Sequence, residues 1–355
     1  MSALKSIHRL INCVLLFIAL SLSQQAFATL HDYPQFMRET PNSKLRINFD
    51  PVNTLLDANV LNMGPSQRHR AKMPVAGGGK SATRIKPNVS IATYNEGNRF
   101  SYELIKRDHN ESKVSSIKNY LESIPTKTPL HLYNKQEQLA YWLNLYNVTL
   151  INEIVKKYPL VKRFMNGNDS FMDEKVIKID GSELSLNDIQ HVVLFEKYHN
   201  DPLIIYGLHQ GSIGGPNINK KTFTGDNVYE LLKSNATDFI NSNRGTQIQS
   251  DVLEVSSYYS LNTKYFPDFD NDLRTHLLQF SDEVTTEIIN QAETIEPIIS
   301  NWHIADLYGS IRGATGGSKP SEKQLNRLSR ILKVRAKNFD NTSVTVTDLE
   351  STQEK

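Results

Sequence analysis

Residues 135–158 (KQEQLAYWLNLYNVTLINEIVKKY) constrain the fold most, because they form the longest amphipathic helix pattern in the chain. Asn144 and Asn147 fall on a stripe beside its apolar face, at the border of the predicted core. A buried amide needs hydrogen-bond partners, so a helix that only packs would not carry asparagine there. The pattern therefore predicts a core helix with two polar groups directed inward. Its apolar face recurs at helical spacing: Leu139, Leu143, Tyr146 and Leu150, with Trp142 and Ile154 at the edges.

Two hypotheses explain these inward polar groups. In the first, the amides of Asn144 and Asn147 bind a ligand, together with Trp142 and the second tryptophan, Trp302. In the second, the amides tie the helix to a neighbouring loop, and the tryptophans anchor the core. The sequence favours the second, and these four residues are the candidates for ligand binding.

The first 28 residues have the pattern of a secretory signal peptide. A charged end with Lys5 and Arg9 precedes an apolar run over residues 10–22, and Ala26 and Ala28 frame a cleavage site. The apolar run is too short for a transmembrane helix, and no later segment has the about 20 apolar residues that spanning needs. We therefore expect an exported protein, periplasmic or secreted, cleaved near Ala28 and without a transmembrane segment in the mature chain.

Cleavage would change two bulk properties of the chain. The only cysteine, Cys13, would be lost, so the mature protein would have no disulfide, no thiolate metal site and no cysteine nucleophile. Lys5 and Arg9 would also be lost, leaving 38 of the 40 Lys and Arg residues against 38 Asp and Glu. A mature chain without net charge argues against nucleic acid as the partner.

Four regions follow from the patterning along the chain. We expect a signal peptide over residues 1–28, a basic, loop-rich N-terminal extension over 29–92, a main domain over 93–312 and a partly disordered tail over 313–355. Within the extension, PVAGGGKS resembles the end of a phosphate-binding loop. Pro74 stands where that motif needs its first glycine, which predicts a flexible basic loop instead.

Helices and short strands alternate in mixed order, which predicts a helix-rich α+β fold with a single main domain and a small central sheet. A buried strand is expected at residues 203–208, and a further strand at 175–180 ends in a turn at Asp180-Gly181. One or two further strands are expected over residues 246–255. Besides the central helix, helices are expected at residues 51–61, 111–123, 186–197, 225–241 and 268–292.

Three blocks resemble the family of domains of unknown function DUF547. QLAYWLNLYN (138–147) resembles its A-F-W-I-N-L-Y-N helix, and SLNDIQH (185–191) resembles its S-L-x-x-I-E-H block. DPLIIYGLHQGSIGGPNI (201–218) occupies the place of its D-P-R-I-H-F-A-L-N-C-x-S-x-S-C-P-P-L segment, and residues 301–309 match more weakly. The resemblance covers residues 96–312. The family has no settled activity that the resemblance could imply. The layout of the family is distantly similar to papain-like and transglutaminase-like folds.

The departures from the family pattern concern its reactive side chains. Gln190 stands where the family carries Glu, and if relatives have a thiol site, this chain has lost it. The resemblance then implies a pseudoenzyme, a binding or scaffold protein on an enzyme-derived fold. Leu203, Ile205, Gln210 and Gly215 stand where the family carries Arg, His and two cysteines.

The loop over residues 209–216 supplies the alternative, an envelope hydrolase or acyltransferase. Ser212 would be the nucleophile and His209 its base, and Asp188, His191 or Asp306 would orient the imidazole. Backbone amides at residues 211 and 214 would be the oxyanion donors. The competing interpretation is a structural loop whose glycines adopt positive φ.

No metal or cofactor is expected. The histidines outside the apolar leader lack the i, i+4 pairing of helical metal sites, and no H-E-x-x-H occurs. The expected partner is a cell-envelope ligand or protein, which the sequence does not identify. An assembly factor that uses the basic residues 64–88 to contact membrane or polysaccharide is a third hypothesis. The candidate metal-ligating histidines are His191, His199, His209 and His303.

Overall fold

The computed structural model describes residues 33–64, 66, 68, 93, 96–159, 171–198 and 201–307. The predictions for the signal peptide, the run PVAGGGKS, His199 and the tail lie outside the described residues, as does most of the basic region 64–88.

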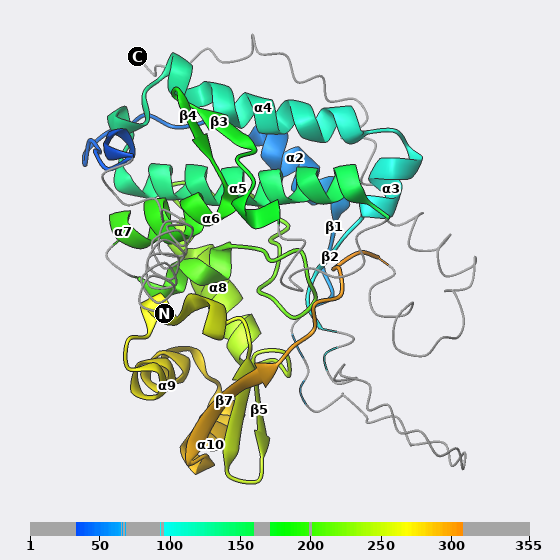
Figure 1. Cartoon of the computed structure of the whole chain (residues 1–355), viewed down its shortest axis with the longest axis vertical. Coiled ribbons are helices and arrows are strands. Elements are labelled where there is room, and N and C mark those ends of the chain that lie inside the picture. The colour runs from blue at the N-terminus through cyan, green and yellow to red at the C-terminus, as the bar shows by residue number, and fades with distance from the viewer. Residues whose placement is uncertain are drawn as a thin grey trace, which may run out of the picture.

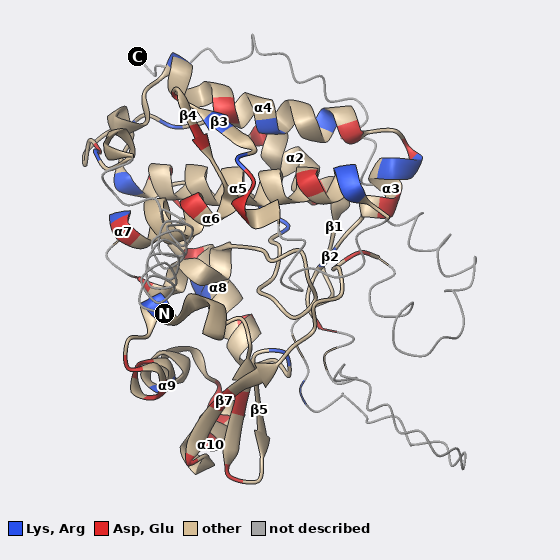
Figure 2. Ribbon diagram, in the orientation of Figure 1, with Lys and Arg blue, Asp and Glu red and all other residues tan. Residues whose placement is uncertain are grey.

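The central helix is α5, Lys135–Lys157, and its predicted position is confirmed. Its amino end is capped by Asn134, whose side chain accepts a hydrogen bond from the Glu137 N–H at 2.9 Å. Residues 137–155 are buried on every side, so Asn144 and Asn147 lie inside the core and not at its border. The charged side chains of α5 lie near its two ends, and its middle carries none (Figure 2).

Helix α4, Glu111–Lys127, packs along α5, and the two lie side by side in Figure 1. The prediction that this helix ends before Pro125 was wrong. Proline has no N–H for the carbonyl one turn earlier, which normally disrupts a helix. Here the hydroxyl of Tyr141 on α5 donates to that carbonyl, of Leu121, at 3.0 Å, and the helix continues to its end.

The second family-like block forms a helix of mixed type. Ser185 and Asp188 form the predicted capping box at the start of α6, Leu186–Asp188. The chain then continues as the π-helix η7, Ile189–Leu194, and as α7, Phe195–Lys197, where a regular helix was expected.

The predicted strand over residues 203–208 is a helix instead. The 3-10 helix η8 spans Pro202–Gly207, and it is buried as expected. A short apolar run does not by itself distinguish a buried strand from a buried helical turn. Asp201 decides between them, because its side chain caps the Leu203 N–H at 2.9 Å and proline follows at the first helical position.

Among the described residues, three small sheets take the place of the predicted central sheet, and the helix-rich α+β class is confirmed. β3, Ile177–Ile179, lies within the predicted strand and pairs antiparallel with β4, Ser182–Leu184, across the predicted turn, with positive φ at Asp180 (48°) and Gly181 (74°). β5, Thr246–Gln249, pairs antiparallel with β6, Val252–Ser256, which pairs parallel with β7, Thr294–Ile299. The smallest sheet joins β1, Val60–Leu61, to β2, Arg99–Phe100.

The β5–β7 sheet lies with α9 and α10 at the end of the molecule opposite α4 (Figure 1). α9, Phe269–Phe280, and α10, Glu283–Gln291, divide the helix predicted over residues 268–292, because the Asp282 side chain caps a new start. The predicted helix near residue 228 is α8, Val228–Ile240. Short 3-10 helices complete the described elements: η2 (Pro34–Phe36), η5 (Leu130–Leu132), η6 (Phe171–Asp173) and η9 (Ser260–Tyr265).

The described part of the predicted N-terminal extension packs into the core of the main domain. α2, Asp50–Asn59, was predicted nearly to its ends, and α3, Tyr102–Arg107, follows β2. The Phe36 ring lies edge-on to Trp142 of α5, with 4.9 Å between ring centroids. The described residues on both sides of residue 93 therefore share one hydrophobic core, and the boundary predicted there does not divide two cores.

Among the described helices, none combines the length and apolar character needed to cross a bilayer.

Candidate functional site: a cleft organised by the central helix

The loop with the predicted catalytic residues is buried. His209 and Ser212 are 1% and 2% exposed. The imidazole Nδ1 lies 3.1 Å from the Pro216 carbonyl oxygen. Its Nε2 and the Ser212 hydroxyl have no hydrogen-bond partner among the described residues, so the two side chains do not bond to each other. The contact that would activate the serine is absent from this part of the chain.

Backbone pairing accounts for the shape of this loop. Ser212 forms an isolated antiparallel bridge with Ile304, and the Ile213 N–H donates to the His303 carbonyl at 2.9 Å. The Gly214 N–H, a predicted oxyanion donor, donates to the Asn301 carbonyl at 2.8 Å. A donor held by the protein backbone is not available to a reaction intermediate.

The remaining groups of the catalytic hypothesis are engaged elsewhere. Asp188 accepts from the Ser185 backbone and pairs with Lys175. Asp306 accepts from the Tyr158 hydroxyl at 3.0 Å. His191 lies half-buried on the π-helix, where desolvation and nearby Lys264 lower its pKa to about 4. None of these groups hydrogen-bonds to the His209 ring or to the Ser212 hydroxyl.

Gln210 and Gly215, which stand where the family pattern has cysteines, are neighbours in space. A Cβ atom built on Gly215 would lie 2.8 Å from the Gln210 Cβ atom. The longer glutamine side chain fits because glycine leaves room for it, and its amide donates to the Leu208 carbonyl at 3.2 Å and the Tyr258 hydroxyl at 3.3 Å. The amide of Gln190, which stands where the family pattern has glutamate, donates to the Asn262 side-chain oxygen at 2.8 Å.

The two asparagines of α5 hold backbone segments, as the favoured hypothesis expected. Asn144 donates to the Phe223 carbonyl at 2.8 Å and accepts from the Phe223 N–H at 3.2 Å and the Thr222 hydroxyl at 3.0 Å. Asn147 donates to the Gly207 carbonyl at 2.8 Å and accepts from the His209 N–H at 2.9 Å. These bonds use the inward amides to fix two loops.

Glu137, in the first turn of α5, joins two further segments and was missed by the sequence analysis. Its carboxylate accepts from the Ile47 N–H at 2.9 Å and from the Gly225 N–H at 3.1 Å. Burial raises the pKa of this carboxyl, while the two backbone donors and Arg46 oppose that rise. An acidic residue at the third position of a helix ordinarily signals only a cap, so its second role could not be predicted.

The segments held by Glu137 and Asn144 form the walls of a surface cleft of about 670 Å³. Two ion pairs also join these walls. Lys220 pairs with Asp57, and Arg46 pairs with Asp226, with 3.0 Å between the guanidinium nitrogen and the carboxylate oxygen. The amino end of α5 therefore positions a concave surface from segments about 170 residues apart. The cleft is lined by Ile47, Asn48, Phe49, Asp50, Asn53, Asp57, Lys220, Lys221, Thr222, Thr224 and Asn227.

Several polar groups of the cleft face solvent. Asn48, Asp50, Asn53 and Lys221 are exposed. The Oδ1 atoms of Asn48 and Asn53 accept from backbone N–H groups, at 2.8 Å and 3.4 Å, which leaves their amide N–H groups as donors. The cleft thus combines amide and ammonium donors with carboxylate acceptors.

Part of the chain that builds this cleft matches a known protein-family model. Residues 130–240 match the model described as a protein of unknown function, DUF547. We call this matching stretch the DUF547 segment. Searches of curated proteins and of solved structures gave no match.

The DUF547 segment contains α5 and the cleft wall at residues 220–227, whereas the wall at residues 47–57 lies outside it. Both asparagines and the predicted catalytic loop are also inside it. The proposed site is therefore completed by a part of the chain that the family model does not match.

Trp142, within the DUF547 segment, and Trp302, outside it, do not line the cleft. Trp142 is fully buried between Phe36 and Tyr141, and its Nε1 has no hydrogen-bond partner in the described ranges. Trp302 is half-buried beside the chain that pairs with the loop around Ser212. The structure thus separates the tryptophans from the surface that Asn144 helps to shape.

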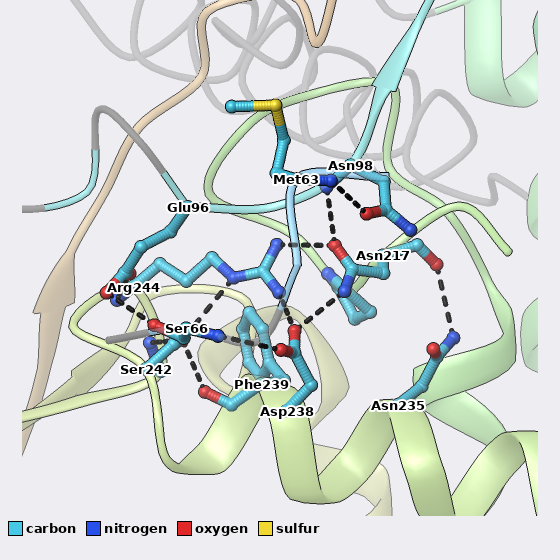
Figure 3. A network of polar contacts seen from close by, with 12 residues as sticks. Met63, Ser66, Glu96, Asn98, Asn217, Asn235, Asp238, Phe239, Ser242 and Arg244 are labelled. Atoms are coloured by element: carbon cyan, nitrogen blue, oxygen red, sulfur yellow. Dashed lines mark hydrogen bonds and ion pairs between the residues drawn. The ribbon is translucent and has the colours of Figure 1, made fainter. Parts of the chain in front are cut away.

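A second polar network at the carboxyl end of the DUF547 segment is structural (Figure 3). Glu96 accepts from the Ser66 hydroxyl at 2.6 Å and from the Arg244 N–H at 3.0 Å. The Arg244 guanidinium pairs with Asp238 and donates to Asn217 at 3.1 Å. These charges satisfy one another, so the network fastens separate segments and offers no open site.

In the described residues, no group of three or more His, Cys, Asp or Glu side chains could hold a metal ion.

Proposed function

We propose that this chain is an exported binding protein whose site is the cleft organised by the amino half of α5. The observation that carries the proposal is that Glu137 and Asn144, polar groups inside a core helix, hold both walls of the cleft. Buried polar groups rigidify the segments they bond. A preformed concave surface lowers the ordering cost of binding.

The cleft chemistry favours a saccharide with hydroxyl and acetamido groups. Carboxylates such as Asp50 accept from sugar hydroxyls, and the amides of Asn48 and Asn53 donate to hydroxyl or carbonyl oxygens. Because carboxylates and ammonium groups are both present, a neutral polar ligand meets no net repulsion. N-acetylated envelope glycans have this chemistry.

Export rests on the leader. The charged end, the apolar run over residues 10–22 and the small residues around Ala28 support a signal peptide and a periplasmic or secreted protein. Such a location would place the cleft in contact with envelope glycans.

The alternative function, acyl transfer by Ser212 and His209, has less support. Both side chains are buried, no bond joins them, and the Gly214 amide is bonded to backbone. A hydrolase would need these groups to meet beside a substrate.

Calorimetric titration of the chain from Thr29 with an N-acetylglucosamine oligomer tests the proposal. We expect saturable binding that Asp50→Asn and Asn53→Ala each weaken roughly threefold to tenfold, the effect of one lost hydrogen bond. Asp270→Asn is the matched control, because Asp50 and Asp270 are both exposed acids in the first turn of a helix. Equal weakening by the control variant, or the absence of binding, would refute the saccharide proposal.

A further inference from the structure

A second pocket, of about 580 Å³, opens between η8, η9 and α9, and it shares no residue with the cleft described above. Its floor is aromatic and its rim is charged. The lining residues used below come from all three elements and from α8: Asp201, Lys233, Tyr265, Phe266, Asp272 and His276.

The Tyr265 hydroxyl is the first sign that this pocket takes a ligand. The residue is 5% exposed and lines the pocket, yet its hydroxyl has no hydrogen-bond partner in the described parts of the chain. Leaving a buried hydroxyl unsatisfied costs about 1–3 kcal/mol, and such groups are rare in folded proteins. A ligand with a hydrogen-bonding group in this pocket would remove that cost.

The floor beside Tyr265 is made of neutral rings. His276 is 5% exposed, and its Nε2 lies 2.9 Å from the Tyr206 hydroxyl, which lies 3.0 Å from the Tyr259 hydroxyl. The Phe266 ring centroid lies 5.6 Å from that of His276. Burial lowers the pKa of His276 to about 4, so the imidazole is uncharged at neutral pH and does not repel a cation.

The charges at the rim are mostly acidic. The charged lining residues are Asp201, Asp272 and one lysine, Lys233. Asp201 accepts a hydrogen bond from the Leu203 N–H at 2.9 Å, and Asp272 accepts one from the Asp268 N–H at 2.8 Å. Each carboxylate therefore keeps acceptor capacity for a ligand. Figure 2 shows the acidic residues of α9, which come from its first turn.

We propose that this pocket binds an organic ammonium ion that carries N–H donors, such as a primary alkylamine. The N–H groups would donate to the Tyr265 hydroxyl oxygen and to the two carboxylates. The alkyl body would pack against the rings of Phe266 and Phe280. The faces of these rings also attract the ammonium charge. The inference is independent of the saccharide cleft, since the two sites share no residue.

The test is calorimetric titration of the chain from Thr29 with cadaverine, with 1-pentanol as a neutral probe and tetramethylammonium as a cation without N–H. We expect saturable cadaverine binding, binding of tetramethylammonium at least about fivefold weaker, and no binding of pentanol. Equal binding of all three probes would show a merely apolar pocket and overturn the proposal, as would a failure of cadaverine to bind.

Two variants locate the site. Tyr265→Phe removes only a hydroxyl without a protein partner, so the fold should be unaffected while cadaverine affinity falls about fivefold or more. Asp272→Asn should also weaken binding, whereas Asp270→Asn, the same change on the same helix but outside the lining, should not. Equal effects of the two Asn variants would indicate general charge attraction and contradict the site, as would unchanged affinity in Tyr265→Phe.

Discussion

Asn144 and Asn147 lie about one turn apart on α5, and each side chain bonds the backbone of a different loop. The amide of Asn144 fixes residues 222–223 at the cleft, and that of Asn147 fixes the end of η8. Helix periodicity predicted that both would point inward and need partners. It could not identify those partners, because they lie about 60 to 80 residues away in the sequence.

Gln210 and Gly215 provide a prediction at the residue scale. With Gln210→Cys and Gly215→Cys combined, the two thiols should form a disulfide on mild oxidation. The ideal Cβ separation of 2.8 Å must open to about 3.8 Å for such a bond, a shift that the loop between them can supply. Mass spectrometry and thiol titration of the oxidised protein measure the bond.

Either single cysteine variant is the control and should keep a free thiol. Two free thiols in the oxidised double variant would contradict the placement of this loop.

His276 provides the second residue-scale prediction, a dependence of stability on pH. The pKa of His276 in the folded protein is about 4, below the usual value of 6.5. As the pH falls, this imidazole is therefore protonated in the unfolded chain before it is protonated in the folded protein. The stabilisation is therefore complete above pH about 6.5 and is lost as the pH falls toward 4, and one such histidine accounts for about 2 kcal/mol between pH 7 and 5. His209, whose burial also lowers its pKa to about 4, acts in the same direction.

Urea unfolding of the wild type and of His276→Gln at pH 7 and pH 5 isolates this contribution. The variant should lose about 2 kcal/mol less than the wild type over this range. Groups common to both proteins, such as Glu137 with its raised pKa, cancel in the comparison. Identical losses would mean that His276 does not change protonation on unfolding.

At the scale of elements, sequence patterns placed most long helices and failed where one residue or a tertiary contact decides the outcome. The apolar run at residues 203–208 is buried as expected, but its cap at Asp201 makes it η8 and not a strand. The π-helix η7 interrupts a regular helical pattern that contains no proline or glycine. Helix α4 continues past a proline that ordinarily ends a helix, because α5 satisfies the freed carbonyl.

Tyr141 and Pro125 allow that last explanation to be tested. Tyr141→Phe should destabilise the protein by about 1–3 kcal/mol, because the Leu121 carbonyl loses its side-chain donor inside the core. In a Pro125→Ala background the backbone N–H of residue 125 can take that place, so the same change should cost less. Urea unfolding of the four proteins in a double-mutant cycle gives the coupling. Additive effects would show that the hydroxyl does not replace the missing backbone bond.

In the described parts of the chain, segments distant in sequence share one hydrophobic core. The α+β class and the family could be predicted, because they depend on local pattern and on short motifs in the DUF547 segment. The cleft could not, since its walls at residues 47–57 and 220–227 meet only through α5. The sequence predicted a loop-rich N-terminal extension for the same reason. Their burial comes from contacts such as Phe36 with Trp142, not from a repeating face.

The central claim is that ligand binds at the cleft and not at the buried loop around Ser212. Backbone amide chemical shifts of the chain from Thr29, recorded during titration with an N-acetylglucosamine oligomer, test it most directly. The account predicts that the saturating shifts fall on residues 47–57 and 220–227. Shifts concentrated on residues 209–216, with slow hydrolysis that Ser212→Ala abolishes, would contradict the account and restore the hydrolase hypothesis.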